Sequence, residues 1–180
     1  MKYFKLIGNQ AYWTLYFKNK ELAKNYVNKI NGQVLLGNWD KCEMEIRFRG
    51  EKANLEPDIM DFGGTSGVVI NTKVYNELQE MIKLYVEFLP VKLEETLYYI
   101  LNPTTILDCI NYELSIKDNK NPFLINKITK YVFKKNIKYP SMFRMKNEER
   151  AIIINEKLAE ALEKNNFIGY SLKEVWDSEG

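Results

Sequence analysis

The stretch VVINTKVYNELQEMIKLYVEFL, from Val68 to Leu89, decides the fold of this chain. A similar stretch, IIINEKLAEALEKNNFIGYSLK, runs from Ile152 to Lys173. Each has an apolar run, an asparagine, an amphipathic segment with apolar residues three or four positions apart, and a second short apolar run. This spacing predicts a strand, a helix and a second strand in each stretch. Chance similarity explains the likeness of the two units as well as duplication does.

Asparagines stand where the two helices should begin. Asn71 and Asn155 each occupy an N-cap position, from which the side chain can accept a free backbone N–H of the first turn. We expect apolar stripes to face the core. The stripe of the first helix is Val74, Leu78, Met81, Ile82 and Tyr85, and that of the second is Leu158, Ala161, Leu162 and Phe167.

The first part of the chain, residues 1–50, is predicted to be rich in β-structure. Tyr3–Ile7 and Tyr12–Phe17 are aromatic and β-branched runs, and Glu43–Arg49 alternates apolar and charged residues as a half-buried strand does. Glu21–Ile30 has apolar residues at helical spacing, and a tight turn over the same residues is an equal alternative.

The next segment, residues 51–67, is polar and interrupted by Pro57 and by Gly63-Gly64. We expect a long surface loop here, and surface loops often carry function. The segment is also the best internal boundary in the chain, although it does not have the character of a linker between independent domains.

The region between the two units is only partly assigned. Leu97–Leu101 is predicted to be a strand that ends at Asn102-Pro103. The pattern of Ile106–Ser115 is ambiguous, and Lys127–Lys134 fits a strand or a short helix.

A hairpin is predicted before the second unit. Met142–Lys146 and Ala151–Ile154 are its strands, and the charged residues Asn147–Arg150 are its turn. Together the elements predict an α+β fold: one compact domain over residues 1–180, with mixed sheets, a β-rich start and a main part over residues 68–180.

Composition excludes several classes of active site. The chain has 180 residues, 26 Lys and Arg against 24 Asp and Glu, a net charge of +2 and no histidine. Without histidine, Ser-His-Asp and Cys-His nucleophiles and histidine-ligated metals are excluded. Cys42 and Cys109 are too far apart in sequence for a zinc knuckle. We therefore expect no catalytic residue, no metal and no cofactor.

The sequence pattern also predicts neither a membrane-spanning segment nor a signal peptide. No run of about 18 apolar residues exists that could cross a bilayer. The first residues, MKYFKLIGNQAYW, lack a continuous apolar region of the kind found in signal peptides. We expect a cytoplasmic protein.

Short motifs that suggest enzymes lack their required context. Asp61-Phe62-Gly63 matches the metal-binding tripeptide of kinases, but no glycine-rich nucleotide loop precedes it. The glycine-rich segment 63–67 has no Gly-Lys-Ser/Thr ending. Pairs of acids such as Glu94-Glu95 could serve a hydrolase only if they faced one cleft. A carboxylate-dependent hydrolase is therefore the weakest alternative.

A lysine-rich segment raises a second alternative. Residues 117–139 contain seven lysines with interleaved aromatic residues, which is typical of a single-stranded nucleic-acid site. An amphipathic element with a lysine-coated outer face gives the same pattern. The segment has no arginine, which offers the bidentate geometry favoured for phosphate recognition. This argues against nucleic acid as the partner.

Residues 57–169 resemble the family-eleven immunity proteins of bacterial polymorphic toxin systems, once described as a domain of unknown function. Short motifs in family order and spacing carry the resemblance, and they are Pro57-Asp58-Ile59, Val69-Ile70-Asn71, Val86–Val91, Tyr99–Asn102, Leu107-Asp108, Ser115, Met142-Phe143-Arg144, Ile153-Ile154-Asn155 and Ile168-Gly169-Tyr170. Asn31-Gly32 with Trp39 fits the family's less regular first part. The family usually shows serine where this chain has Asn71, and both residues cap helices.

The resemblance implies a non-enzymatic protein that binds and neutralises a cognate toxin domain, and that acts in the cytoplasm. Interfaces rest on a few anchors, often Trp, Tyr or Arg, and loops often carry specificity. We therefore expect the toxin contacts among Trp39, Glu56, Asp58 and Asp61.

Four residues of the family motifs, Glu87, Pro90, Asp108 and Arg144, are expected to serve the fold instead. Val86 and Phe88 should point into the core, which leaves Glu87 facing outward or toward a cation. The planar guanidinium of Arg144 suits a bidentate carboxylate partner. The candidate partners are Asp58, Glu87 and Asp108.

Overall fold

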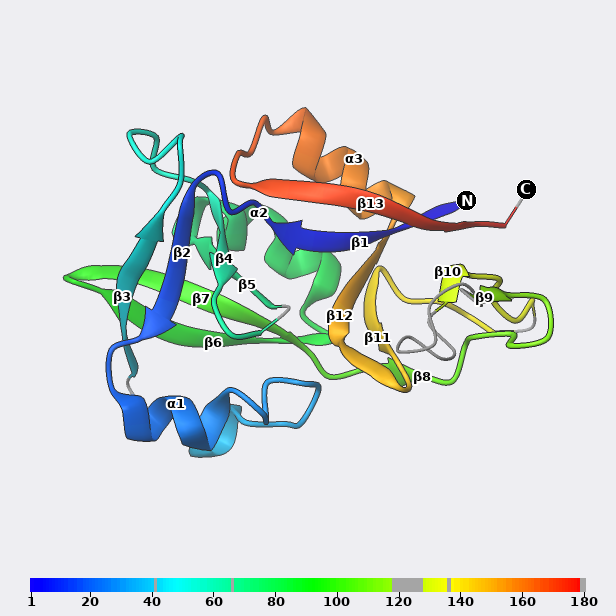
Figure 1. Ribbon diagram of the computed structural model, residues 1–180, viewed down its shortest axis with the longest axis horizontal. Helices are drawn as coiled ribbons and strands as arrows, with labels where there is room; N and C mark the ends of the chain where they lie inside the picture. Colours follow the sequence, from blue (N-terminus) through cyan, green and yellow to red (C-terminus); the bar gives the residue numbers. More distant parts are fainter. Residues whose placement is uncertain (41, 66, 118–127, 136, 179–180) are drawn as a thin grey trace.

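Both strand–helix–strand units are present in the computed structural model (Figure 1), which describes residues 1–40, 42–65, 67–117, 128–135 and 137–178. The helices are α1 Lys20–Tyr26, α2 Thr72–Ile82 and α3 Glu156–Lys164, with a 3₁₀ turn η1 at Leu36–Asn38. The strands are β1 Lys2–Gly8, β2 Trp13–Phe17, β3 Cys42–Arg49, β4 Ile59–Phe62, β5 Gly67–Asn71, β6 Val86–Leu93, β7 Thr96–Pro103, β8 Ile106–Leu107, β9 Ile116–Lys117, β10 Ile128–Lys130, β11 Met142–Met145, β12 Glu148–Asn155 and β13 Tyr170–Asp177. The class is α+β, as the sequence predicts.

The two predicted N-caps are confirmed. The Asn71 side chain accepts the Val74 N–H at 3.0 Å, and the Asn155 side chain accepts the Leu158 N–H at 3.0 Å. Each asparagine ends a strand and begins a helix, so both turns from strand to helix are fixed by the same local contact.

Six strands close into a barrel in the order β2-β3-β6-β7-β5-β4. The pairs β2–β4 and β3–β6 are parallel, and the other pairs are antiparallel. Leu15, Phe62 and Leu89 fill the interior. Helix α1 packs against the same cluster through Tyr26, and so does Ile30 in the segment that follows α1. Figure 1 shows α1 closing the lower end of the barrel.

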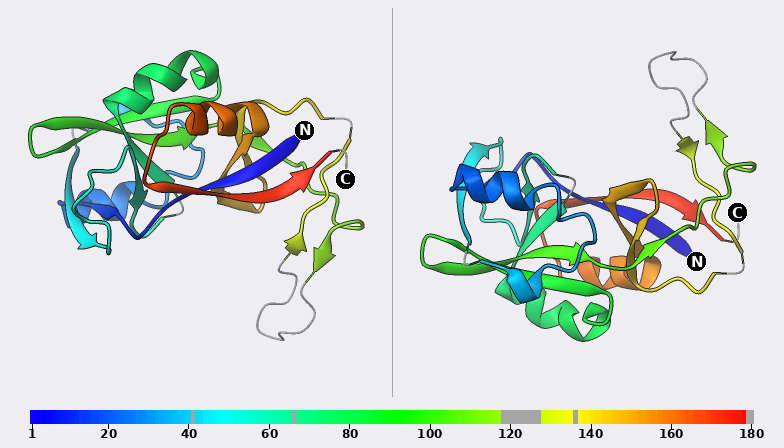
Figure 2. Two further views of the ribbon diagram at one scale, coloured as in Figure 1. Left: turned by 90° about the horizontal axis from the view of Figure 1, so that it is seen from above. Right: turned by 90° about the horizontal axis from the view of Figure 1, so that it is seen from below.

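A second sheet lies beside the barrel in the order β13-β1-β12-β11-β8. One apolar core joins the two, because Leu6 and Ile154 from this sheet pack with Ile70 and Leu101 from the barrel. Helices α2 and α3 contribute to the same core. Figure 2 shows both helices on one side of the molecule, which we call the back.

The other face of the second sheet carries a separate aromatic cluster. Tyr3, Phe143 and Phe133 pack there with Trp176. Strands β9 and β10 form a two-stranded arm that projects away from the side covered by α2 and α3 (Figure 2). We call the side of the arm, seen in Figure 1, the front.

The expectation of a loop throughout residues 51–67 is wrong. Ile59–Phe62 forms β4, whose four residues are all buried between β2 and β5. The breakers Pro57 and Gly63-Gly64 bound a short buried strand instead of interrupting a loop. Gly63 is also required because a Cβ there would lie 2.0 Å from the Tyr16 ring.

Several predicted boundaries also shift. The first helix ends at Tyr26, before Ile30, and the hairpin turn is shorter than expected because β11 reaches Met145 and β12 begins at Glu148. Strand β7 runs to Pro103 itself. Met81 does not belong to the buried stripe of α2, since its side chain is 39% exposed.

Leu78→Ala should lower the free energy of unfolding by about 2–5 kcal/mol, because Leu78 is 1% exposed in the shared core. Met81→Ala in the same helix is the matched control and should change it by less than about 0.5 kcal/mol. Chemical denaturation of both variants checks this. Equal effects would mean that α2 presents a different face to the core.

Candidate functional site

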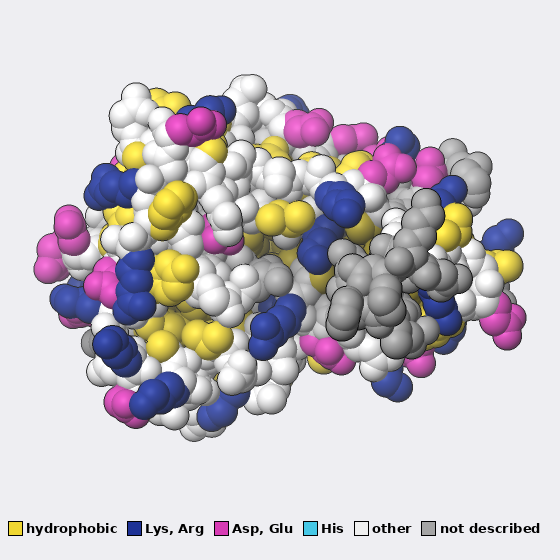
Figure 3. Space-filling view, viewed as in Figure 1, with side chains coloured by type: hydrophobic (Ala, Val, Ile, Leu, Met, Phe, Trp, Pro, Cys, Tyr) yellow, Lys and Arg dark blue, Asp and Glu magenta, His cyan; other side chains and the backbone are white. Residues whose placement is uncertain are grey.

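The front face carries basic and aromatic side chains over adjoining strands. Figure 3 shows dark-blue and yellow side chains across the middle of this face. Two features occupy it: arginine–aromatic stacks on β2 and β3, and a polar hollow between β1, β4 and the start of β13. They adjoin because β2 pairs with β4, with Thr14 opposite Asp61.

The first feature consists of two stacked arginines. The Arg47 guanidinium lies 5.0 Å from the centre of the Tyr16 ring, and that of Arg49 lies 5.3 Å from the Trp13 ring. Strands β2 and β3 are antiparallel with Trp13 opposite Arg49, so each cation comes from one strand and its ring from the other. Arg47 also donates to Glu45 at 2.6 Å. These contacts hold exposed guanidinium groups in defined positions.

The second feature is a hollow of about 440 Å³. Its lining is mostly polar and consists of Lys5, Ile7, Gly8, Asn9, Gln10, Asp61, Thr65, Gly67 and Ser171. Gly8 allows β1 to cross β4 closely, because a Cβ at Gly8 would lie 2.3 Å from the Asp61 Cα. The hollow is therefore built from strand ends and fixed by close backbone packing.

Asp61 is the buried acid of the hollow, with only 8% of its surface exposed. Burial raises the pKa of its carboxyl group above the ordinary value, and the polar side chain of Gln10 beside it opposes this shift. A carboxyl group with a raised pKa in a cleft marks a candidate functional position.

Lysines flank the hollow. Lys5 lies directly opposite Lys173 across the β1–β13 ladder, so both side chains point to the same face of the sheet. Neither lysine makes an ion pair with any part of the chain that the structure describes. Like charges in directly opposite positions disfavour folding, so this pair adds positive charge to the front face at a cost in stability.

The structure separates the four residues predicted to contact a toxin. Three of them make hydrogen bonds inside the protein. The Trp39 Nε1–H donates to the Pro90 carbonyl at 2.8 Å, and Glu56 accepts from the Tyr98 hydroxyl at 2.8 Å. Asp58 accepts from the Asn71 side chain and from the Ile168 N–H, both at 3.0 Å. Asp61 alone of the four lines the hollow.

Two family-motif residues, Glu87 and Asn102, bond the backbone of residues 33–36, and a third, Pro90, bonds the side chain of Trp39. Glu87 meets no cation among the described residues, contrary to one expectation; its carboxylate accepts the N–H groups of Leu35 at 2.8 Å and Leu36 at 2.9 Å. Asn102 donates to Glu87 at 3.0 Å and to the Gln33 carbonyl at 2.8 Å. Pro90 supplies the carbonyl that receives Trp39.

Arg144 is fully buried. The prediction that a carboxylate binds it through two hydrogen bonds is wrong. Its guanidinium donates to the backbone carbonyls of Pro103 at 3.0 Å, Glu149 at 2.5 Å and Arg150 at 3.2 Å, with longer contacts to Ile30 and Asn102. Burial lowers the pKa of Arg144 to about 10, so the group remains charged at neutral pH. Backbone oxygens replace the carboxylate because the guanidinium presents five donors in one plane.

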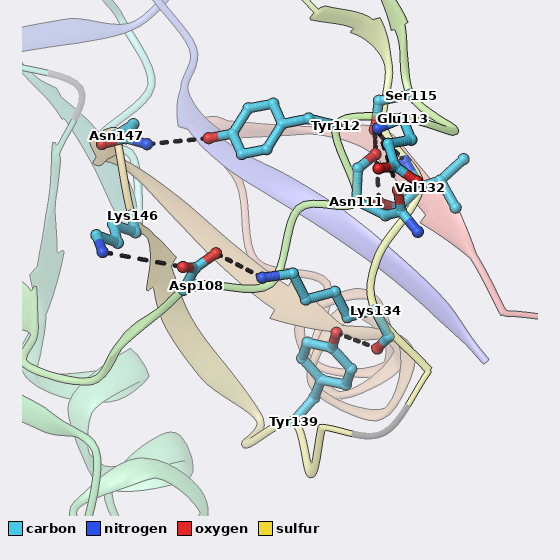
Figure 4. Close-up of polar contacts among 10 residues, drawn as sticks. All are labelled: Asp108, Asn111, Tyr112, Glu113, Ser115, Val132, Lys134, Tyr139, Lys146 and Asn147. Atoms are coloured by element: carbon cyan, nitrogen blue, oxygen red, sulfur yellow. Dashed lines mark hydrogen bonds and ion pairs between the residues drawn. The ribbon is translucent and has the colours of Figure 1, made fainter.

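Asp108, the third carboxylate considered for Arg144, lies at the base of the arm (Figure 4). It pairs with Lys134 at 2.8 Å and Lys146 at 3.8 Å, which lowers the pKa of its carboxyl group. Figure 4 also shows Asn111 and Ser115 holding the turn that leads into the arm. Much of the lysine-rich segment, residues 118–127 and 136, lies outside the described residues.

Among the described residues, neither the cysteines nor the acidic side chains are arranged for thiol or metal chemistry. Cys42 and Cys109 are buried and unpaired, and burial raises the pKa of each thiol to about 12. Such thiols are inert at neutral pH. Within residues 1–178, apart from the gaps noted above, no three Cys, Asp or Glu side chains converge as metal ligands would.

Comparison with protein-family models finds no family that matches this chain, and comparison with curated protein sequences finds no similar protein. Among the described residues, no helix has the length and apolar character needed to cross a membrane.

The sequence named Asp61 but missed the basic groups around it. The alternation of Glu43–Arg49 already placed Arg47 and Arg49 on the outer face of a strand, so their exposure was available from the pattern. The pairing of Lys5 with Lys173 joins distant parts of the chain, and no local signal reveals it.

Asp61→Asn should raise the melting temperature at neutral pH. A buried carboxyl group with a raised pKa destabilises the folded state at pH values above 3.8, its ordinary pKa. This destabilisation grows until the pH passes the raised pKa. The gain should disappear in acid, below 3.8. Asp108→Asn is the control with the opposite sign, because lysines lower the pKa of Asp108. Thermal melts over pH check both, and a destabilised Asp61→Asn would contradict the assignment.

Arg144→Met should lower the free energy of unfolding by at least about 3 kcal/mol, since several buried carbonyls lose their donor. Arg150→Met is the control, because its exposed side chain makes only a 3.5 Å contact, to Asn28, within the part of the chain that the structure describes. It should change stability by less than about 0.5 kcal/mol. Urea denaturation of both variants measures the difference.

Proposed function

We propose that this chain is a non-enzymatic immunity protein of the cytoplasm that binds and neutralises a cognate toxin domain, and that the front face is its contact surface. The ordered motifs of residues 57–169 support the class of protein. The surface itself supports binding to another protein.

The observation that carries the proposal is the pair of stacked arginines on β2 and β3. Arginine, tyrosine and tryptophan are the residues that contribute most often to binding energy at protein interfaces. Arg47 over Tyr16 and Arg49 over Trp13 bring these types together on one exposed face.

Rigidity makes these side chains effective anchors. Ordering a long side chain at an interface costs conformational entropy on binding. Arg47 is already held by its contacts with Tyr16 and Glu45. Its placement on a closed barrel also limits backbone movement, so little ordering remains to be done in the complex.

Charge indicates the character of the partner. Arg47, Arg49, Lys5 and Lys173 place four cations on the front face, where Glu45 pairs with Arg47 and Glu174 lies near the two lysines. A complementary partner would present an acidic surface, and opposite charges would speed association at low salt. Steric cover of an active site by such a complex would neutralise a toxin without any chemistry.

The test uses the toxin domain encoded by the neighbouring gene. Co-expression should restore growth of cells that produce this domain, and the two purified proteins should form a stable complex. Absence of both effects would contradict the proposal. Tight, steeply salt-dependent binding of a single-stranded oligonucleotide by the chain alone would favour the nucleic-acid alternative instead.

Arg47→Ala and Arg49→Ala should each weaken toxin binding at least about tenfold, as interface anchors do. Their melting temperatures should change little, because exposed cation–π contacts contribute only about 0.5–1 kcal/mol. Lys157→Ala, on the exposed side of α3 at the back, is the matched control and should bind normally. Calorimetric titration measures all three affinities. Unchanged binding by both arginine variants would remove β2 and β3 from the interface.

A further inference from the structure

We propose that the hollow around Asp61 receives an arginine side chain of the protein partner. This inference rests on the proposed function and deepens it, because it names a specific contact within an otherwise basic surface. The observations are the burial of Asp61, the lining of the hollow and the charges around it.

The first step concerns the charge at the base of the hollow. Asp61 is 8% exposed and makes no ion pair with any lysine or arginine that the structure describes. The polar side chains beside its carboxylate, Gln10 and Thr14, are neutral. A buried carboxylate without a cation is costly, and the raised pKa of Asp61 reflects that cost. A cation from a partner would remove it.

The second step concerns the shape of the cation. The hollow holds about 440 Å³ and is lined beside the carboxylate by Thr65, Ser171, Asn9 and Gln10. The Thr65 and Asn9 oxygens each accept one backbone N–H and keep a second lone pair for a ligand. A guanidinium has five N–H donors in one plane and needs several acceptors, whereas an ammonium group is compact and more strongly hydrated. The number and spread of acceptors therefore favour arginine over lysine.

The third step concerns selectivity. Lys5 and Lys173 beside the hollow repel a partner surface that is basic throughout. A partner that suits both these lysines and Asp61 therefore presents an arginine within an acidic surface. The hollow is also preformed, because β4 is paired on both sides and Gly8 packs directly against the Asp61 backbone. A preformed site loses little entropy when it is filled.

The experiment measures the Asp61 carboxyl group by NMR in the full chain labelled with ¹³C-aspartate. The probe is N-acetyl-arginine methylamide, and the neutral control is the citrulline analogue. We expect the arginine probe to cause a saturable shift of the Asp61 signal, to lower the pKa of Asp61, and to move the amides of Gly8 and Gly67. The citrulline analogue should cause none of these changes.

Variants complete the test. Asp61→Asn should weaken binding of the probe at least about tenfold, the loss expected for one charge-assisted pair. Asp108→Asn, at a distant exposed acid, should bind as the wild type does. A lysine analogue that binds as tightly as the arginine probe, or an Asp61→Asn variant that binds it equally well, would overturn the assignment.

Failure of this inference differs from failure of the proposed function. If the wild type does not bind the toxin domain, the proposed function fails whatever the probe does. If the wild type and Asp61→Asn bind the toxin domain equally tightly, the proposed function stands and the arginine contact is wrong. Binding by the wild type that weakens at least about tenfold in Asp61→Asn supports both.

Discussion

The buried guanidinium of Arg144 joins the parts of this protein that the chain connects only at long range. Arg144 comes from β11 of the second sheet, and it bonds the last carbonyl of barrel strand β7 at Pro103. It also bonds the carbonyls of Glu149 and Arg150 in β12 and reaches that of Ile30 in the segment after α1. Burying this charge costs several kcal/mol, which only a nearly complete set of acceptors can offset. The barrel, the second sheet and residues 30–38 must therefore hold their positions together.

A division between frame and surface follows from these contacts. Asp58 joins the start of β4 to the turn before β13, and Glu87 holds residues 35 and 36. These polar contacts and the apolar core beneath α2 and α3 together fix the backbone. The front face contributes less to this frame: its arginines stack on aromatic rings at the surface, and its lysines oppose each other. Side chains that stabilise the fold weakly are the ones free to serve a partner.

Local pattern predicted much of the fold and little of the site. The apolar spacing of Val68–Leu89 and Ile152–Lys173, with their capping asparagines, located both helices correctly. It missed β4, because four residues between a proline and two glycines are too few to show a period. The partners of Arg144 are backbone oxygens, which leave no trace in the sequence. Asp61 was selected for its place in a supposed loop, whereas its importance comes from burial in a strand.

The acceptors of Arg144 have a consequence for how such proteins diversify. A backbone carbonyl is present whatever side chain its residue carries, so substitutions at positions 30, 103, 149 and 150 leave the oxygens in place as long as the local chain path is kept. A lineage that keeps one arginine can thus revise the residues around it without losing the clamp. The residues of the outer strands can then change while the contacts that hold the fold together stay the same.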